Sequence, residues 1–186
     1  MQSVETASYE RLEFLGDGGQ FPIAFTRLLT PFTAILDLSV MHYLFKKFAK
    51  ATCGQLSWAR QRVVCNTTLA WLAVNKLNVQ KLLLQNNAVL SFAIRSAVDL
   101  LESMTAEEIV SDGWKIDVPK PLSDVVEALF GAIFIDIGYD YEKTASIICD
   151  AVREILELLS PDMPRDPSSR LMVFVGKMGC RKVKFR

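Results

Sequence analysis

The 186-residue chain is 51% apolar and 23% charged, which excludes disorder over most of its length and suffices for one sizeable hydrophobic core. Its formal net charge is zero, but residues 165–186 hold seven basic side chains and one acidic side chain, which leaves 14 basic and 20 acidic side chains in residues 1–164. A body of that sign attracts nucleic acid poorly, so action on a phosphate backbone would need metal ions, a basic strip or a basic module.

Apolar residues recur at intervals of three and four along most of the chain, which is typical of helices. The pattern predicts helices over residues 8–17, 34–49, 56–72, 79–84, 88–104, 123–137 and 141–159. Glycines and prolines separate these runs, and three prolines between residues 161 and 167 follow the last of them. We therefore expect an all-α bundle over residues 1–160 and a basic C-terminal tail over residues 161–186.

The sequence shows no pattern of a membrane or secreted protein. The longest apolar run, Ala128–Ile135, is far shorter than a membrane helix, and the N-terminal MQSVETASYE does not resemble a signal peptide. The four cysteines lack CxxC spacing, and the single histidine leaves few ligands for zinc. We expect reduced thiols, an intracellular location in cytoplasm or nucleus, and no membrane partner.

Two predicted helices carry acidic side chains on one face. In YERLEFLGD, Glu10, Glu13 and Asp17 are spaced by three and four residues, which places them one turn apart on a helix. In PLSDVVEALFGAIFID, Asp124 and Glu127 are also three residues apart. Two such helices can converge into an oxygen-only pocket of the kind that suits Mg²⁺ or Mn²⁺.

The same carboxylates also fit a simpler role in helix starts and solvated faces. Asp124 and Glu127 lie near the start of their predicted helix, with Ser123 as N-cap, where negative charge compensates the helix dipole. Glu10 and Glu13 fit a solvated face. Spacing alone leaves both explanations open.

These segments resemble the ribonuclease III family. YERLEFLGD, resumed at AILDLSVMHYLF, is similar to the family's signature helix, and PKPLSDVVEALFGAIFIDIGYD is similar to its second acidic motif. The resemblance extends from about Tyr9 to about Leu159, which implies a ribonuclease III-like helical bundle and a ribonuclease III domain over residues 1–160. In the tail, PSSRLMVFVGKMGC is similar to the segment that leads into the double-stranded-RNA-binding module of Dicer-like members, so residues 161–186 resemble the truncated start of such a module.

The resemblance implies a metal-dependent endoribonuclease that cleaves double-stranded RNA to 5′-phosphate and 3′-hydroxyl ends, in RNA processing or RNA silencing. Glu13, Asp17, Asp124 and Glu127 match the family's ligands for Mg²⁺ or Mn²⁺, and Glu10 matches an auxiliary acidic position.

Three residues would take part in catalysis: Asp17, Glu127 and Lys120. Lys120 matches a lysine that could stabilise the charged phosphoryl group, and a solvated loop lysine is the alternative. Family members pair two such domains, as a homodimer or as tandem copies. The implied partners are therefore double-stranded RNA and a second ribonuclease III domain.

The chain departs from the family's pattern directly after Asp17. Here 16 residues, Gly18–Thr33, interrupt a motif that is continuous in the family, and their glycines and prolines predict that the helix ends at Asp17 and a loop follows. Without this insertion, Asp37 would fall four helical positions after Asp17. The insertion could be a tolerated loop, a lesion that weakens dimerisation and catalysis, or translated intron sequence. The alternative function is therefore a non-catalytic ribonuclease III-like module that dimerises or binds RNA.

Overall fold

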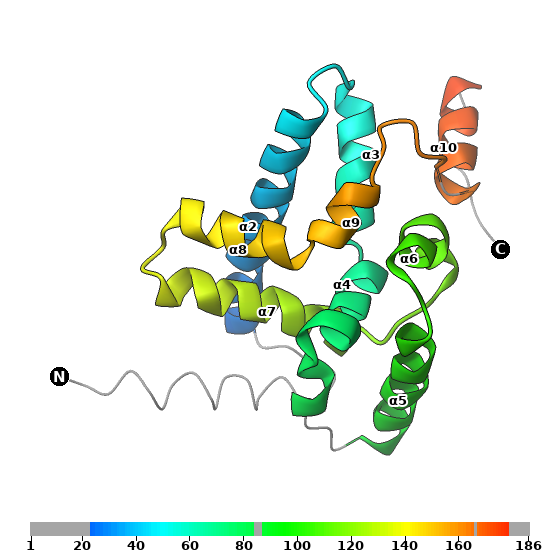
Figure 1. Cartoon of the computed structure of the whole chain (residues 1–186). Helices are drawn as coiled ribbons and strands as arrows, with labels where there is room; N and C mark the ends of the chain where they lie inside the picture. Colours follow the sequence, from blue (N-terminus) through cyan, green and yellow to red (C-terminus); the bar gives the residue numbers. More distant parts are fainter. Residues whose placement is uncertain (1–22, 84–86, 166, 179–186) are drawn as a thin grey trace.

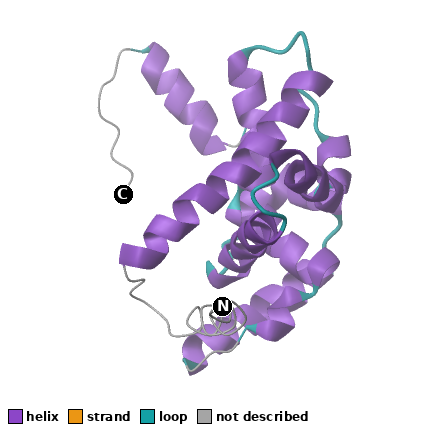
Figure 2. Cartoon of the chain, turned by 90° about the vertical axis from the view of Figure 1, so that its left-hand side faces the viewer, coloured by secondary structure: helices purple, strands orange, loops and turns teal. Residues whose placement is uncertain are grey.

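The computed structural model describes residues 23–83, 87–165 and 167–178, and within these ranges the chain folds into helices and loops with no strand (Figures 1 and 2). The prediction of an all-α bundle is confirmed. Its helices enclose one core, with α2, α7 and α8 packed together on one side and α4 running against α7.

Helix α2 (Ile23–Lys47) is longer than the sequence pattern predicted. The prediction of a loop through Thr33 is wrong for residues 23–33, because these residues continue the helix into AILDLSVMHYLF. Pro31 lies inside the helix, although proline supplies no amide hydrogen for the bond to the preceding turn. The neighbouring Ala, Leu and Arg residues favour helix, which offsets part of that cost. The predicted helix over residues 8–17 lies outside the described residues.

The expected helix over residues 56–72 is divided in two. Helix α3 (Cys53–Val64) begins with a capping box in which Thr52 and Gln55 bind each other's backbone amides, and α4 (Asn66–Leu72) follows after Cys65. Cys65 has an extended backbone, with φ −75° and ψ 152°. The Arg62 carbonyl, left without a helical partner, accepts a hydrogen bond of 2.7 Å from the Thr68 hydroxyl.

The middle of the chain contains short turns and two helices. After α4 come a π-helical turn η2 (Ala73–Leu77) and a 3₁₀ turn η3 (Val79–Leu82), where a helix over residues 79–84 was expected. Helix α5 (Ala88–Glu102) lies close to its prediction. Helix α6 (Ala106–Asp112) was not predicted, although Thr105 and Glu108 form the capping box that the sequence TAEE indicates. The 3₁₀ turn η4 (Gly113–Lys115) follows it.

Helix α7 (Pro121–Asp136) begins two residues before the predicted start. The expectation that Ser123 is the N-cap is wrong, because Lys120 is the N-cap and Pro121 occupies the first helical position, where a missing amide hydrogen costs nothing. The Ser123 hydroxyl donates to the Lys120 carbonyl at 2.8 Å. The expected helix over residues 141–159 is broken at Val152 into α8 (Tyr141–Ala151) and α9 (Arg153–Leu158).

The core is built from apolar side chains that face one another across these helices. Helix α4 is the most deeply placed, because every residue from Thr67 to Leu72 is buried. The largest fully buried side chains come from α2, α3, α4, α5, α7, α8 and α9, and include Leu36, Val40, Leu44, Val63, Leu69, Leu72, Leu101, Leu122, Phe130, Ile148, Ile155 and Leu156. The core therefore draws on elements from nearly the whole described chain.

A short segment over residues 160–165 connects the bundle to helix α10 (Pro167–Lys177), in the part of the chain predicted to be a basic tail. Figure 1 shows α10 at the margin of the bundle. Several of its apolar side chains are exposed, among them Leu171, Met172 and Phe174. None of the described helices combines the length and apolarity that crossing a bilayer requires.

Candidate functional site

The first turns of α7 hold an acidic side chain that is withdrawn from solvent. Asp124 is only 4% exposed, and burial raises the pKa of its carboxyl group. Lys120 acts in the opposite direction, since its Nζ lies 3.6 Å from Asp124 Oδ2. That oxygen is buried and accepts no hydrogen bond from the described residues. A helix-start residue that only compensates the dipole has no need of such burial.

Glu127 lies one turn further along α7 and is half-buried. The structure thus places Asp124 and Glu127 one turn apart on α7, with Lys120 at the N-cap of the same helix. Carboxylate oxygens are the donors that Mg²⁺ and Mn²⁺ prefer, and Asp124 Oδ2, which is ion-paired with Lys120 but accepts no hydrogen bond from the described residues, fits such a ligand. Among the described residues, no group of three or more acidic, histidine or cysteine side chains is close enough to hold a metal ion. Within the described residues, the candidate ligands on α7 are therefore the pair Asp124 and Glu127.

The other predicted ligands, Glu13 and Asp17, and the auxiliary Glu10 lie outside the described residues. In the described part of α2, residues 23–33 directly precede AILDLSVMHYLF, in the place where the family's motif has its first acidic segment. Counting back from Ala34, the helical positions that Asp17 and Glu13 would occupy in an uninterrupted motif hold Thr33 and Leu29. Helix α2 contains a single acidic residue, Asp37.

Asp37 has a partner that the sequence did not reveal. Its Oδ2 accepts a hydrogen bond of 2.8 Å from Arg60 Nη1, which connects α2 to α3. Its Oδ1 is buried and accepts no hydrogen bond within the described part of the chain. No spacing rule joins residues 23 positions apart on different helices, so only the packing of α2 against α3 could show this pair.

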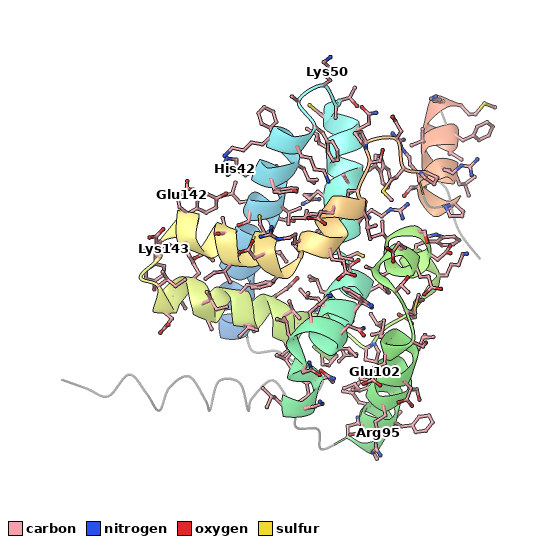
Figure 3. The ribbon with its side chains drawn as sticks, in the orientation of Figure 1. His42, Lys50, Arg95, Glu102, Glu142 and Lys143 are labelled. Atoms are coloured by element: carbon pink, nitrogen blue, oxygen red, sulfur yellow. The ribbon has the colours of Figure 1, made fainter. Side chains whose placement is uncertain are left out.

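The only histidine of the chain is engaged at the contact between α2 and α8. His42 Nδ1 lies 3.3 Å from the Tyr141 hydroxyl, and the two rings are stacked with centroids 6.2 Å apart. Figure 3 shows His42 on α2 near Glu142 in the first turn of α8. The imidazole thus serves a helix contact in the described structure.

An apolar groove runs along α2 where it faces α3. Its cavity measures about 820 Å³, and Leu38, Met41 and Phe45 of α2 line it together with Leu56 and Arg60 of α3. Phe45 is 69% exposed, and Leu38 and Met41 are each 51% exposed. Exposed apolar side chains that adjoin one another in this way are typical of an interaction surface.

The family model of the Ribonuclease III domain matches residues 33–138, which contain α3 to α7 and the C-terminal part of α2. The chain belongs to the ribonuclease III family. The resemblance seen in the two acidic motifs is confirmed. Members of this family act on double-stranded RNA, generally depend on divalent metal ions and typically dimerise.

Curated relatives include both large and small ribonuclease III proteins. The chain is 32% identical over 143 residues to Protein Dicer of Schizosaccharomyces pombe, and 29% identical over 178 residues to Endoribonuclease Dicer of Danio rerio. These matches cover 76% and 90% of this chain but only 9% of either relative. Ribonuclease 3 of Pseudomonas paraeruginosa is 32% identical over 171 residues, which cover 92% of this chain and 58% of that protein.

Proposed function

We propose that this ribonuclease III family chain is a metal-dependent endoribonuclease that cleaves double-stranded RNA to 5′-phosphate and 3′-hydroxyl ends, in RNA processing or RNA silencing. The observation that carries the proposal is the buried Asp124 carboxylate with Glu127 one turn away on α7. Burying a carboxylate costs stability unless a cation or hydrogen bonds compensate it, and Lys120 offsets only part of that cost, because the pKa of Asp124 is still raised. A side chain kept in that position is more consistent with a functional site than with a solvated helix start.

The proposed ligands of Mg²⁺ or Mn²⁺ are Glu13, Asp17, Asp124 and Glu127, with Glu10 as an auxiliary acid. When bound, the divalent ion would supply an activated water and neutralise charge on the phosphate. The carboxylates would hold that ion, Asp124 and Glu127 from the first turns of α7.

Lys120 is placed to act on the phosphate side of the same site. Its ammonium group lies at the start of α7, within 3.6 Å of Asp124, and its side chain is 64% exposed. A cation in this position can hold a phosphoryl oxygen and offset the charge that develops on it. The Lys120→Gln variant should therefore cut more slowly, and its free energy of unfolding should fall somewhat, because the buried Asp124 carboxylate loses its neighbouring cation.

The deciding experiment is cleavage of a long labelled RNA duplex by the purified chain with Mg²⁺. The Glu127→Gln variant should lose cleavage with its helical circular dichroism unchanged. The exposed Glu142→Gln on α8 is the matched control and should cut as the parent does. Cleavage by Glu127→Gln at the parental rate would refute the ligand assignment.

The continuous helix α2 favours a second candidate function, a non-catalytic module that dimerises or binds RNA. Its residues 23–33 contain no acidic side chain and lie directly before Ala34, where the uninterrupted motif would place Glu13 and Asp17. A variant that lacks Gly18–Thr33 tests this. If only the deletion variant cuts RNA, the intact chain is the non-catalytic form, and if neither cuts, the enzyme proposal fails.

We further propose that the groove between α2 and α3 receives a second ribonuclease III domain. Leu38, Met41 and Phe45 expose apolar surface there, and the family typically pairs its domains. A charge at the most exposed of these positions would oppose burial, so Phe45→Glu should shift the chain to monomer in sedimentation velocity. The matched control is Phe92→Glu on α5, an exposed aromatic residue outside the groove. Equal sedimentation of both variants and the parent would exclude this face.

A further inference from the structure

A second cavity, on a different part of the bundle, is lined by two tryptophans. It measures about 110 Å³ and is lined by Trp58, Gln61 and Arg62 of α3, by Thr67 of α4 and by Trp114 of η4. A single water molecule needs about 10–15 Å³ of such space, so the cavity admits a larger group. Neither the acidic residues nor the groove of α2 and α3 contributes to it. We call it the tryptophan pocket.

The floor of the tryptophan pocket is buried and its rim is open. Thr67 is 8% exposed and Ile109 is 3% exposed, whereas Trp114 is 50% exposed and Gln61 is exposed. The pocket therefore combines aromatic faces and an apolar floor with an accessible amide. Such a composition suits a planar ring that carries hydrogen-bonding groups at its edge.

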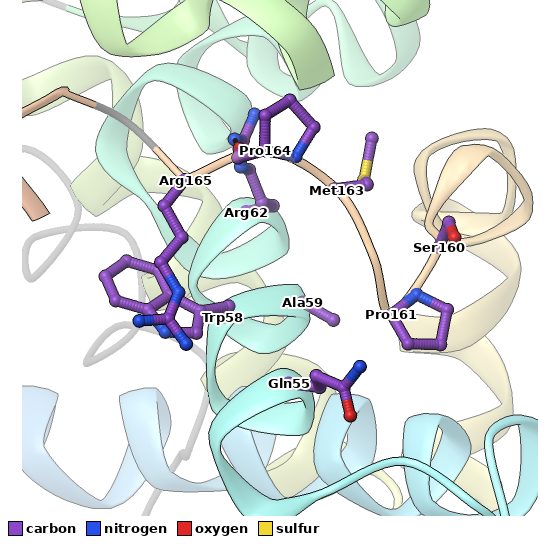
Figure 4. A pocket seen from close by; sticks show the side chains of 9 residues that line it. All are labelled: Gln55, Trp58, Ala59, Arg62, Ser160, Pro161, Met163, Pro164 and Arg165. Carbon is purple, nitrogen blue, oxygen red and sulfur yellow. Dashed lines mark hydrogen bonds between the residues drawn. The ribbon is translucent and has the colours of Figure 1, made fainter. Parts of the chain in front are cut away.

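Each tryptophan is accompanied by a cation. The guanidinium carbon of Arg165 lies 4.9 Å from the centroid of the Trp58 ring, and Lys115 Nζ lies 5.3 Å from the centroid of the Trp114 ring. Figure 4 shows the Arg165 side chain against the Trp58 ring. Arg62 adds a third positive charge to the lining. Lys115 is ion-paired with Asp112 at 2.6 Å, so most of the positive charge that favours an anionic group on a planar ring over a cationic ligand comes from Arg62 and Arg165.

The pocket is also held in shape before any ligand arrives. Arg62 donates to the carbonyl oxygens of Val110 and Pro164, which fixes its side chain between α6 and the segment over residues 160–165. Gln55 Nε2 donates to Asp162 Oδ1 at 2.9 Å and fastens the same segment to α3. These contacts keep Arg165 over Trp58. A preorganised site loses less entropy on binding.

We propose that the tryptophan pocket binds one unpaired nucleotide of an RNA strand, with the base against an indole ring and the phosphate near Lys115 and Arg165. Aromatic stacking with adjacent cations is the usual chemistry by which proteins hold single-stranded nucleic acid. The choice of RNA rests on the proposed function, whereas the choice of a nucleotide rests on the pocket itself. Binding in the tryptophan pocket would not require the bound strand to be cleaved at the acidic site.

Binding of a single-stranded RNA of about six nucleotides, measured by tryptophan fluorescence in EDTA, tests this without cleavage. Of the three tryptophans, Trp71 is buried and donates to the Met104 carbonyl, so quenching reports mainly on Trp58 and Trp114. For the variants, the same strand with a terminal dye is followed by fluorescence anisotropy. Trp114→Ala should weaken binding about 5- to 150-fold, as expected for loss of one stacking partner.

Further variants keep the test decisive if Trp114→Ala is poorly folded. Trp114→Phe retains an aromatic ring and should keep most of the affinity, and Lys115→Gln should bind more weakly with a shallower dependence on salt. Phe92→Ala, an exposed aromatic residue on α5, should bind as the parent does.

Three results would overturn the proposal: no saturable binding, equal affinity of Trp114→Ala and Phe92→Ala, or equal competition by a blunt RNA duplex. Because the assay needs neither metal nor cleavage, failure here is distinct from failure of the nuclease proposal.

Discussion

Truncation of Phe130 tests how α7 is oriented in the bundle. Phe130 is 1% exposed and is the largest fully buried side chain among the described residues, and it lies on the helix that carries Asp124 and Glu127. Phe130→Ala would remove most of a buried aromatic ring and leave a cavity, which costs about 3–5 kcal/mol in protein cores. The free energy of unfolding of a native domain is about 5–15 kcal/mol in total, so the variant would lose a large share of its stability.

The loss of stability can be measured by urea and thermal unfolding, with the helical signal followed by far-ultraviolet circular dichroism. A loss of about 3–5 kcal/mol corresponds to a fall in Tm of roughly 6–20 °C for a chain of this length. Phe130→Leu retains more of the volume and should cost less than Phe130→Ala. Ile135→Ala is the matched control, since Ile135 lies on the same helix and is 43% exposed.

Ile135→Ala should lower the free energy of unfolding by well under half as much as Phe130→Ala, because a large part of the Ile135 side chain is already exposed to water. Equal losses for Phe130→Ala and Ile135→Ala would refute the orientation of α7. The set of α7 side chains that face the core would then lose its support.

Three further predictions concern caps and thiols. Thr105→Ala removes half of the capping box with Glu108 and should lower the free energy of unfolding by about 1 kcal/mol in urea titrations. A hydrogen bond from the Lys143 backbone amide lowers the pKa of the Asp140 carboxyl group. The carboxylate therefore stabilises the fold at pH values above its ordinary pKa of 3.8, and this stabilisation is lost as the pH falls through the lower pKa of the folded state. Asp140→Ala should lower the free energy of unfolding more at pH 7 than at pH 3, and equal losses at the two pH values would contradict this. Burial raises the pKa of the Cys149 thiol, so iodoacetamide followed by peptide mass spectrometry should label the exposed Cys53 well before Cys149, and equal rates would contradict the burial.

Local patterns predicted most helices because their causes are local. The apolar spacing over residues 88–104 and 123–137 corresponds closely to α5 and α7, and the pair Asp124 and Glu127 was visible from spacing alone. The sequence TAEE also contained the capping box of α6, which hydrophobic periodicity missed because the helix is only seven residues long.

The sequence by itself determined the family, the helical class and the residues of both acidic motifs, because motif identity and helical periodicity depend on neighbours along the chain. The tertiary structure decided the rest. It showed that Ile23–Thr33 is helical despite Pro31, that Asp37 pairs with Arg60, and that Trp58 and Trp114 share a pocket. These features depend on which helix faces meet, and contacts between distant residues are set by the packing of the whole bundle rather than by local sequence.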